Sequence, residues 1–272
     1  MAIKDLLVAY DGSAGADAAL RMGAALARRH GAKLTGLLAH GAAADYAASA
    51  RWMSAETRAI LETANSAVLD EARAQFAARA AAEGLADVPL LSEAGRPDLI
   101  VSDCAKYHDL TLLGRFDEDA ADARLILHPD RIALRTGRPL LVVPAGFERE
   151  VLQSRALVAW DGGRSAARAL ADAMQILEGQ AQVTVLTIGD GARPAPGRDI
   201  ETHLANHGVT TDWVRLSKSD DVGRTLLDYA DDHAPDLIVM GAYEHSKFRE
   251  DFFGGVTDTV LRRTTAPVLL SH

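Results

Sequence analysis

The sequence predicts an α/β protein built from two tandem doubly wound domains, each a five-stranded parallel sheet flanked by helices. Short apolar runs of strand length alternate with segments in which apolar residues recur every three or four positions. This alternation is typical of βαβ units, in which the strands run parallel and helices cover them. The whole pattern occurs twice along the 272 residues, which indicates two domains.

Three blocks of similar sequence recur in the same order, which indicates a duplication. The paired blocks are 7–12 with 157–162, 109–114 with 236–241, and 135–142 with 263–270. The first two blocks stand 103 residues apart from Asp11 to Gly114 but only 80 from Asp161 to Gly241. The first half should therefore carry an insertion of about 23 residues, in the Ala-rich stretch after Ala39.

In the first half, five apolar runs predict the strands. They are residues 6–10, 33–39, 88–92, 110–113 and 139–143. The helix after Asp11 places Ala19, Met22 and Leu26 on one face, and Gly31 supplies its stop.

The apolar pattern in the inserted stretch predicts one long helix that packs on the domain. Its apolar stripe should consist of Leu61, Ala64, Val68, Ala72 and Phe76.

In the second half, the predicted strands follow the same order. They are residues 156–160, 182–188, 211–216, 237–240 and 267–270. The helix after Asp161 should end near Gly179. Its predicted buried face consists of Ala167, Leu170, Ala171, Met174 and Leu177.

Pro144 and Gly146 interrupt the last strand of the first half, and charges follow, which is typical of a linker. We therefore expect domains at residues 1–146 and 152–272. Both terminal strands, 139–143 and 267–270, begin with proline and are apolar, which favours edge strands that another domain covers. One such pairing could join the halves within a chain, and the remaining surface predicts a homodimer.

Composition excludes several partners. The longest apolar runs are far shorter than the roughly 20 residues that a membrane helix needs, so no span is predicted. The N-terminus enters a strand-like run without a signal segment, which predicts a cytoplasmic protein. The net charge of −9 and the lack of a basic run disfavour nucleic acid.

The loop after the predicted strand 237–240 could hold a phosphate. It begins at Gly241 and ends with the pair Gly254 and Gly255 before a helix, so that backbone N–H groups could approach an oxyanion. The alternative is that these glycines only permit a turn and a helix start.

Asp161 ends the neighbouring strand, where it could accept hydrogen bonds from a ribose or a base. It could equally be a helix cap, and the residues leave both alternatives open.

The strand-Asp-Gly opening, the glycine loop and the closing Ala-Pro-Val-Leu-Leu strand resemble the universal stress protein family over essentially the whole chain, twice. The resemblance implies strand order 3-2-1-4-5, dimerisation through the last strand, and binding of ATP or a related adenine nucleotide in some members. Magnesium would enter only with ATP. The family's first-strand Asp corresponds to Asp11 and Asp161. The candidate nucleotide-contacting residues are Asp161, Gly241, Glu244, Gly254, Gly255 and Val256.

Two departures from the family pattern weaken nucleotide binding. Glu244 stands at the second glycine position, and a carboxylate about 4 Å from a phosphate costs about 1–4 kcal/mol. Gly255 replaces the family's Ser or Thr and removes a hydroxyl donor. In the first half, acidic residues in 117–122 and Leu127-His128 replace the loop pattern. We therefore predict that the first half does not bind nucleotide and is a structural and dimerising partner.

Three functions follow from this sequence. The first is a stress-response binding or sensing protein whose second half holds an adenine nucleotide. The second is an interaction scaffold that has lost nucleotide binding, for which Glu244→Gly should create or strengthen ATP binding. The third, a slow nucleotide hydrolase, rests only on fold analogy. Because the chain shows no nucleophile elbow, no paired carboxylates and no Cys–His frame, we predict neither catalytic residues nor a metal site.

Overall fold

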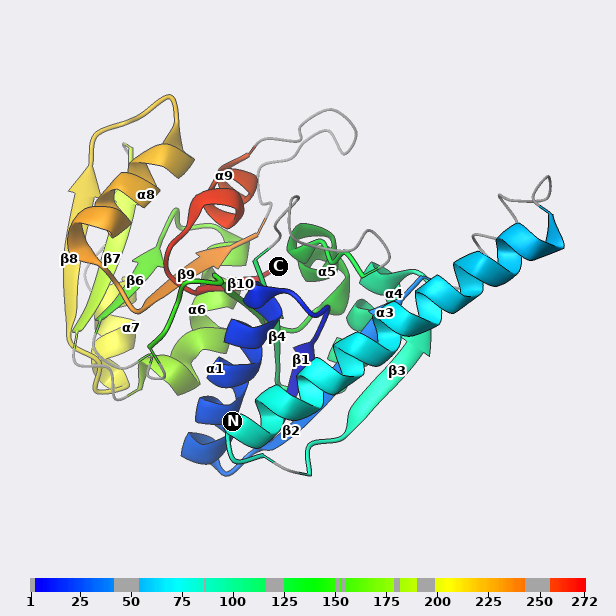
Figure 1. Cartoon of the computed structure of the whole chain (residues 1–272). Coiled ribbons are helices and arrows are strands. Elements are labelled where there is room, and N and C mark those ends of the chain that lie inside the picture. The colour runs from blue at the N-terminus through cyan, green and yellow to red at the C-terminus, as the bar shows by residue number, and fades with distance from the viewer. Residues whose placement is uncertain are drawn as a thin grey trace.

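A ten-stranded sheet runs through the computed structural model of the chain (Figure 1). The structure describes residues 3–41, 54–85, 87–115, 125–149, 152, 155–178, 182–189, 199–242 and 255–272. Across the sheet the strands follow the order β3-β2-β1-β4-β5-β10-β9-β6-β7-β8. Each half therefore has the order 3-2-1-4-5, and the predicted fold class is confirmed.

The first half alternates strands and helices along the chain. Its elements are β1 (Asp5–Ala9), α1 (Ala14–His30), β2 (Lys33–His40), α3 (Ala55–Ala82), β3 (Leu90–Ala94), α4 (Pro97–Ala105), β4 (Leu110–Gly114), α5 (Pro129–Thr136) and β5 (Leu140–Val143). The second half repeats that alternation. Its elements are β6 (Arg155–Ala159), α6 (Arg164–Leu177), β7 (Gln182–Ile188), α7 (Ile200–Asn206), β8 (Thr211–Leu216), α8 (Val222–His233), β9 (Leu237–Gly241), α9 (Val256–Arg263) and β10 (Val268–Ser271).

The last strands of the two halves pair with each other inside the chain. β5 and β10 run antiparallel, with Leu141 opposite Leu269, while the other strand pairs are parallel. Each of these strands also pairs with the fourth strand of its own half, so neither is an edge of the sheet. The expected pairing of the halves through their terminal strands is thus present within one chain.

Proline sets where three strands begin. The predicted third strand started at residue 88, but β3 begins at Leu90, because Pro89 has no N–H to donate to a ladder. Its carbonyl oxygen still accepts the N–H of Gly36 at 2.8 Å. Pro139 and Pro267 likewise stand just before β5 and β10, and their carbonyl oxygens accept N–H groups from β4 and β9.

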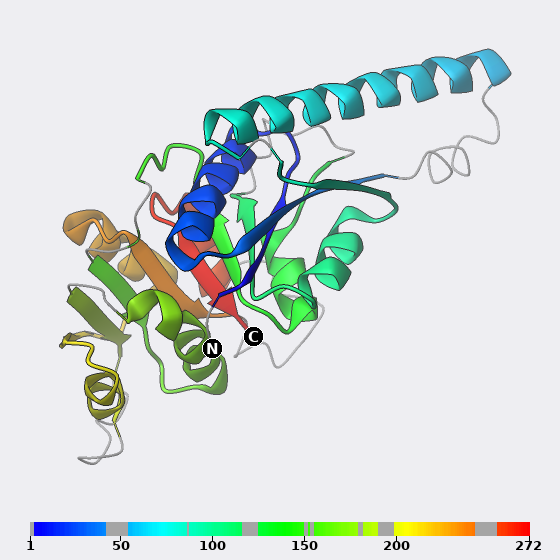
Figure 2. The same cartoon turned by 90° about the horizontal axis from the view of Figure 1, so that it is seen from below.

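Helices cover both faces of the sheet, as Figure 2 shows. Side chains of α1, α3, α6 and α7 form one hydrophobic core with one face. Side chains of α4, α5, α8 and α9 form the other core with the opposite face. The strands are apolar on both faces because both are buried, which is usual for parallel sheets.

The predicted long helix is present as α3, between β2 and β3 where the second half has the shorter α7, but its predicted stripe is only partly buried. Ala72 and Phe76 are buried in the core, while Ala64 is exposed and Val68 is half-buried. The N-terminal end of α3 extends beyond the sheet in both views, so only its C-terminal half has a surface to pack on (Figures 1 and 2). The side chain of Leu61 lies outside the described part.

The buried face of α6 also differs from the prediction. Leu170, Met174 and Leu177 are buried as expected, but Ala167 and Ala171 are exposed. Ala166, Ala169 and Ala173 take the buried positions instead. Alanine is small and only weakly apolar, so alanines on both sides of a helix do not mark which face is buried.

The described residues between the halves pack against the rest of the protein. Phe147 is buried in the core that contains α1 and α6, and its carbonyl oxygen accepts a hydrogen bond from Arg21 at 2.7 Å. Arg149 forms an ion pair with Asp236, which also accepts the N–H of Arg155 at 3.1 Å. Among the described residues, no helix is long and apolar enough to cross a membrane.

Candidate functional site

The predicted site residues that the structure describes lie at the carboxyl edge of the second half. Asp161 follows β6 and Gly241 ends β9, and these two strands are parallel neighbours. Gly255 and Val256 begin α9, the helix that follows β9 in the chain. Glu244 and Gly254 lie outside the described residues. Because β6 and β9 end side by side, Asp161 and Gly241 share one edge, as predicted from the sequence.

Asp161 shapes the turn that leads into α6. Its Oδ1 atom accepts the N–H of Gly163 at 2.8 Å, and Gly162 has a φ of 79°. Asp11 makes the same turn in the first half, where it accepts the N–H of Ser13 at 2.9 Å. Gly12 there also has a φ of 79°. This turn accounts for an Asp-Gly pair in both halves, so Asp161 has a structural role whether or not it also contacts a ligand.

Gly241 is held in close contact with α6. A Cβ atom on Gly241 would stand 2.5 Å from the backbone N of Ala166 and 2.7 Å from the Cβ of Ser165. In the first half, a Cβ on Gly114 would stand 2.6 Å from the carbonyl carbon of Gly15. The glycine that ends the fourth strand is therefore required by helix packing in both halves, a reason that the sequence alone did not reveal.

Two helices of the second half begin at glycines without a side-chain cap. They are α6, with Gly163 as N-cap, and α9, with Gly255 as N-cap. Gly255 is exposed, Val256 is 37% exposed, and no described atom lies within 4 Å of a Cβ placed on Gly255. The first backbone N–H groups of a helix carry partial positive charge and can bind an anion.

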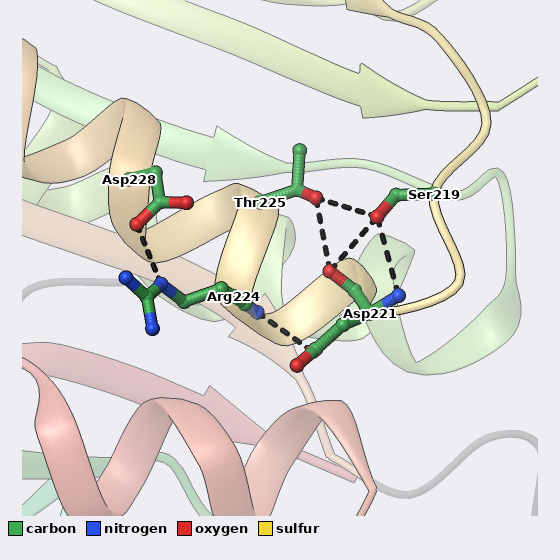
Figure 3. Close-up of polar contacts among 5 residues, drawn as sticks. All are labelled: Ser219, Asp221, Arg224, Thr225 and Asp228. Carbon is green, nitrogen blue, oxygen red and sulfur yellow. Dashed lines mark hydrogen bonds and ion pairs between the residues drawn. The ribbon is translucent and has the colours of Figure 1, made fainter.

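The other two helices of this half carry their own caps. Asp199 accepts the N–H of Thr202 at 2.6 Å at the start of α7. At the start of α8, Asp221 accepts the N–H of Arg224 at 2.9 Å, and the Thr225 hydroxyl donates to the Asp221 carbonyl (Figure 3). The helices without a side-chain cap are thus the two that flank the edge formed by Asp161 and Gly241.

The corresponding edge of the first half is covered by α3. A Cβ on Gly12 would meet the side chains of Gln75 at 3.3 Å and Ala72 at 3.8 Å. At Gly162, by contrast, no described atom lies within 4 Å of such a Cβ. The two glycines have the same φ, so the difference lies in what surrounds them.

Tyr10 and Asp17 fix α3 in that position. The rings of Tyr10 and Phe76 meet edge to face, with centroids 5.2 Å apart. The Tyr10 hydroxyl donates to Asp17 at 2.7 Å, and Asp17 also forms an ion pair with Arg79 at 2.9 Å. Burial and the Asp17 carboxylate raise the pKa of Tyr10 well above its ordinary value. In the second half Trp160 stands at the position of Tyr10 and is only partly buried.

Burial changes the chemistry of Asp11. Loss of hydration raises the pKa of its carboxyl above the ordinary value, and the hydrogen bonds from Ser13 oppose that shift. Asp161 is exposed. The two first-strand aspartates therefore share a turn but not an environment.

Apolar side chains and a carboxylate also lie in the described part of the first-half edge. Leu38, Leu69, Ala72 and Leu125 form a small hydrophobic cluster of their own. At the start of α5, His128 donates its backbone N–H to Asp98 at 2.9 Å, and its ring Nδ1 lies 3.0 Å from the same carboxylate. His128 is the N-cap of α5, as Gly255 is the N-cap of α9. The protein's own carboxylate therefore lies where an anion could approach α9 in the second half.

The described residues contain no group of three or more His, Cys, Asp or Glu side chains that could hold a metal ion. The second-half edge combines an exposed carboxylate with two helix starts, which suits hydrogen bonding to a polar ligand and binding of an anion.

Known proteins give a consistent match. The model of the universal stress protein family matches residues 2–144 and 198–272. A universal stress protein from Synechocystis is 28% identical over 196 residues, which cover 68% of this chain and 66% of that protein. A universal stress protein structure from Archaeoglobus fulgidus has a TM-score of 0.69 at 16% identity and covers 98% of this chain and 95% of its own. A putative universal stress protein from Pseudomonas aeruginosa has a TM-score of 0.59, also at 16% identity, with 99% and 93% covered.

Proposed function

Because the chain belongs to the universal stress protein family, a family of stress-response proteins, we propose that it is a stress-response binding protein that holds an adenine nucleotide at the carboxyl edge of its second half. In this proposal the first half, residues 1–146, is a covered partner that binds no nucleotide, and residues 152–272 form the binding domain. The protein acts in the cytoplasm by binding rather than by catalysis.

One contrast carries this proposal. Gly12 and Gly162 have the same φ of 79°, yet Gly12 is covered by α3 and the surroundings of Gly162 are open among the described residues. The covered half also has Asp98 at the start of α5, whereas α9 begins at an exposed glycine without a side-chain cap. Among the described residues, α3 lies over the first edge and nothing lies over the second, which supports binding at the second edge.

The chemical groups at this edge are of the types that bind a nucleotide. The N–H groups at the start of α9 suit a phosphate, and the exposed carboxylate of Asp161 suits a ribose hydroxyl or a base N–H. With ATP bound, magnesium would offset part of the triphosphate charge near Glu244. Gly255 offers backbone but no hydroxyl, so the phosphate contact rests on main-chain amides.

A second candidate function is an interaction scaffold that binds no nucleotide. Gly241 favours it, because helix packing alone explains a glycine there and the first half keeps Gly114 for the same reason.

In either case a homodimer would have to use a surface other than β5 and β10, because these two strands already pair with each other within the chain. A monomer at micromolar concentration by light scattering would contradict the homodimer.

Two measurements test the nucleotide proposal. Denaturation of the purified chain followed by mass spectrometry should release an adenine nucleotide, and titration with ATP and magnesium should give heat. The variant Glu244→Gly should bind ATP up to about a thousandfold more tightly if its carboxylate faces phosphate, since removal of about 1–4 kcal/mol of repulsion is expected. No released nucleotide and no heat from the unmodified chain would favour the scaffold. A gain of ATP binding in Glu244→Gly would then identify Glu244 as the cause of the loss, and no gain would contradict that cause.

A further inference from the structure

Arg115 connects the first half to the helix that begins at the proposed site of the second half. Its backbone belongs to the first half, where its N–H donates to the carbonyl oxygen of Val143 at 2.9 Å. The first turn of α1 lies against that backbone, because a Cβ on Gly15 would stand 3.3 Å from the N and 3.4 Å from the O of Arg115. The main chain of Arg115 is therefore fixed relative to β5 and α1.

The side chain of Arg115 reaches across to α9. Its guanidinium donates to the carbonyl oxygen of Arg262 at 2.8 Å and lies 3.4 Å from that of Thr264. The last carbonyl groups of a helix lack partners within the helix and carry partial negative charge, so a cation there both satisfies and stabilises them. The side chain of Arg262 is engaged elsewhere, with Asp258 at 2.9 Å.

The helix held in this way is short. α9 runs from Val256 to Arg263, about 12 Å at the usual rise per residue. Its N-terminus has no side-chain cap at Gly255, while its C-terminus receives the guanidinium of Arg115. A helix of two turns moves largely as one body, so a contact at its end also limits movement at its start.

We propose that Arg115 is a positioning residue that couples the carboxyl edge of the first half to the start of α9. A change at Arg115 would then loosen α9 without touching the second-half site. The effect on α9 stands on the contacts above, whereas the effect on ligand affinity rests on the proposed function.

Hydrogen exchange of the full-length chain tests this coupling at α9, with α4 of the first half as the reference. In Arg115→Ala the amides of residues 256–263 should exchange about fivefold faster, since two contacts to a charged donor are lost, and those of α4 should not change. Arg115→Lys should restore part of the protection because an ammonium group can still donate to a carbonyl. Arg262→Ala is the matched control and should change exchange less than about twofold, since the carbonyl that Arg115 contacts remains.

Unchanged exchange in Arg115→Ala, or equal acceleration of α9 and α4, would overturn the coupling. Titration with ATP and magnesium adds the link to the site, where Arg115→Ala should weaken binding about threefold and Arg262→Ala should not. Equal affinity of Arg115→Ala and the unmodified chain would overturn that link. If the unmodified chain binds no ATP, the proposed function fails, and the exchange result still decides the coupling.

Discussion

Gly241 lies so close to Ser165 that a Cβ on the glycine would stand 2.5 Å from the carbonyl carbon of the serine. Gly114 has the same relationship to Gly15, at 2.6 Å. The first half keeps this glycine although its edge is covered by α3. A glycine at the end of the fourth strand is thus a packing requirement in both halves, and the nucleotide proposal has to stand on Asp161 and α9 instead.

Substitution of either glycine should destabilise the protein. Gly241→Ala and Gly114→Ala each force backbone to move, and we expect a loss of about 1–3 kcal/mol in the free energy of unfolding. Urea unfolding measures this loss. Gly146→Ala is the control, because no described atom lies within 4 Å of its Cβ position, and its effect should stay within about 0.5 kcal/mol. Equal effects at all three positions would contradict the packing argument.

A hydroxyl at the start of α9 should increase both the stability of the fold and the affinity for ATP. Gly255 has N-cap backbone angles, φ −81° and ψ 179°, and open space around its Cβ position among the described residues. Gly255→Ser should therefore raise the free energy of unfolding by roughly a few tenths of a kcal/mol. A hydroxyl that donates to phosphate should also tighten ATP binding by about tenfold. Calorimetry measures both effects, and weaker ATP binding would place the phosphate elsewhere.

The C-terminal half of α3 should contribute far more stability than its N-terminal half. Phe76 is 2% exposed and packs edge to face on Tyr10, so Phe76→Ala should cost about 3–5 kcal/mol. Ile60 on the same helix is 63% exposed, and Ile60→Ala should stay within about 0.5 kcal/mol. Thermal or urea unfolding compares the two variants. A large loss from Ile60→Ala would show that the projecting end of α3 is covered in solution.

Asp11 should make stability depend on pH in a defined direction. Burial raises the pKa of its carboxyl in the folded protein above the ordinary value of 3.8, and the nearby Asp17 carboxylate adds to that shift. The folded state then holds this proton more tightly than the unfolded chain, so this carboxyl costs stability at neutral pH. The cost decreases as the pH falls below the raised pKa and is gone below the ordinary value.

The variant Asp11→Asn isolates this contribution. It keeps an oxygen to accept the N–H of Ser13 and removes the buried charge. The difference in melting temperature, Asp11→Asn minus the unmodified chain, should therefore be larger at pH 7 than at about pH 4. Calorimetry at both pH values measures the difference. The same difference at both pH values would contradict a destabilising charge on Asp11 in the folded protein.

The strands and the duplication were predictable because parallel strands buried on both faces leave continuous apolar runs. All ten strands lie where those runs predicted them, within one or two residues at each end. Pro89, Pro139 and Pro267 account for the later starts of β3, β5 and β10. The long helix in the insertion was also correct. Which part of α3 packs could not be read from its stripe, since Ala64 and Ala72 look alike in sequence and only the extent of the sheet separates them.

The site was harder to predict, because its character comes from contacts across the fold. The sequence identified Asp161, Gly241 and Gly255 but left open whether the glycines contact a phosphate or only permit a turn and a helix start. Nothing local reveals that Gly241 meets Ser165. The acidic segment 117–122 was the basis for the prediction that the first half does not bind nucleotide, and this segment lies outside the described residues. The covering by α3 and the Asp98–His128 contact supply independent reasons that depend on distant residues.

The stoichiometry of ATP binding tests the central claim most directly, because the two halves share a fold and differ in what covers their edges. Titration of the full chain with ATP and magnesium should give one nucleotide per chain, abolished by Asp161→Ala and retained in Asp11→Ala. Two nucleotides per chain, or loss of binding in Asp11→Ala but not in Asp161→Ala, would contradict the assignment of the site to the second half.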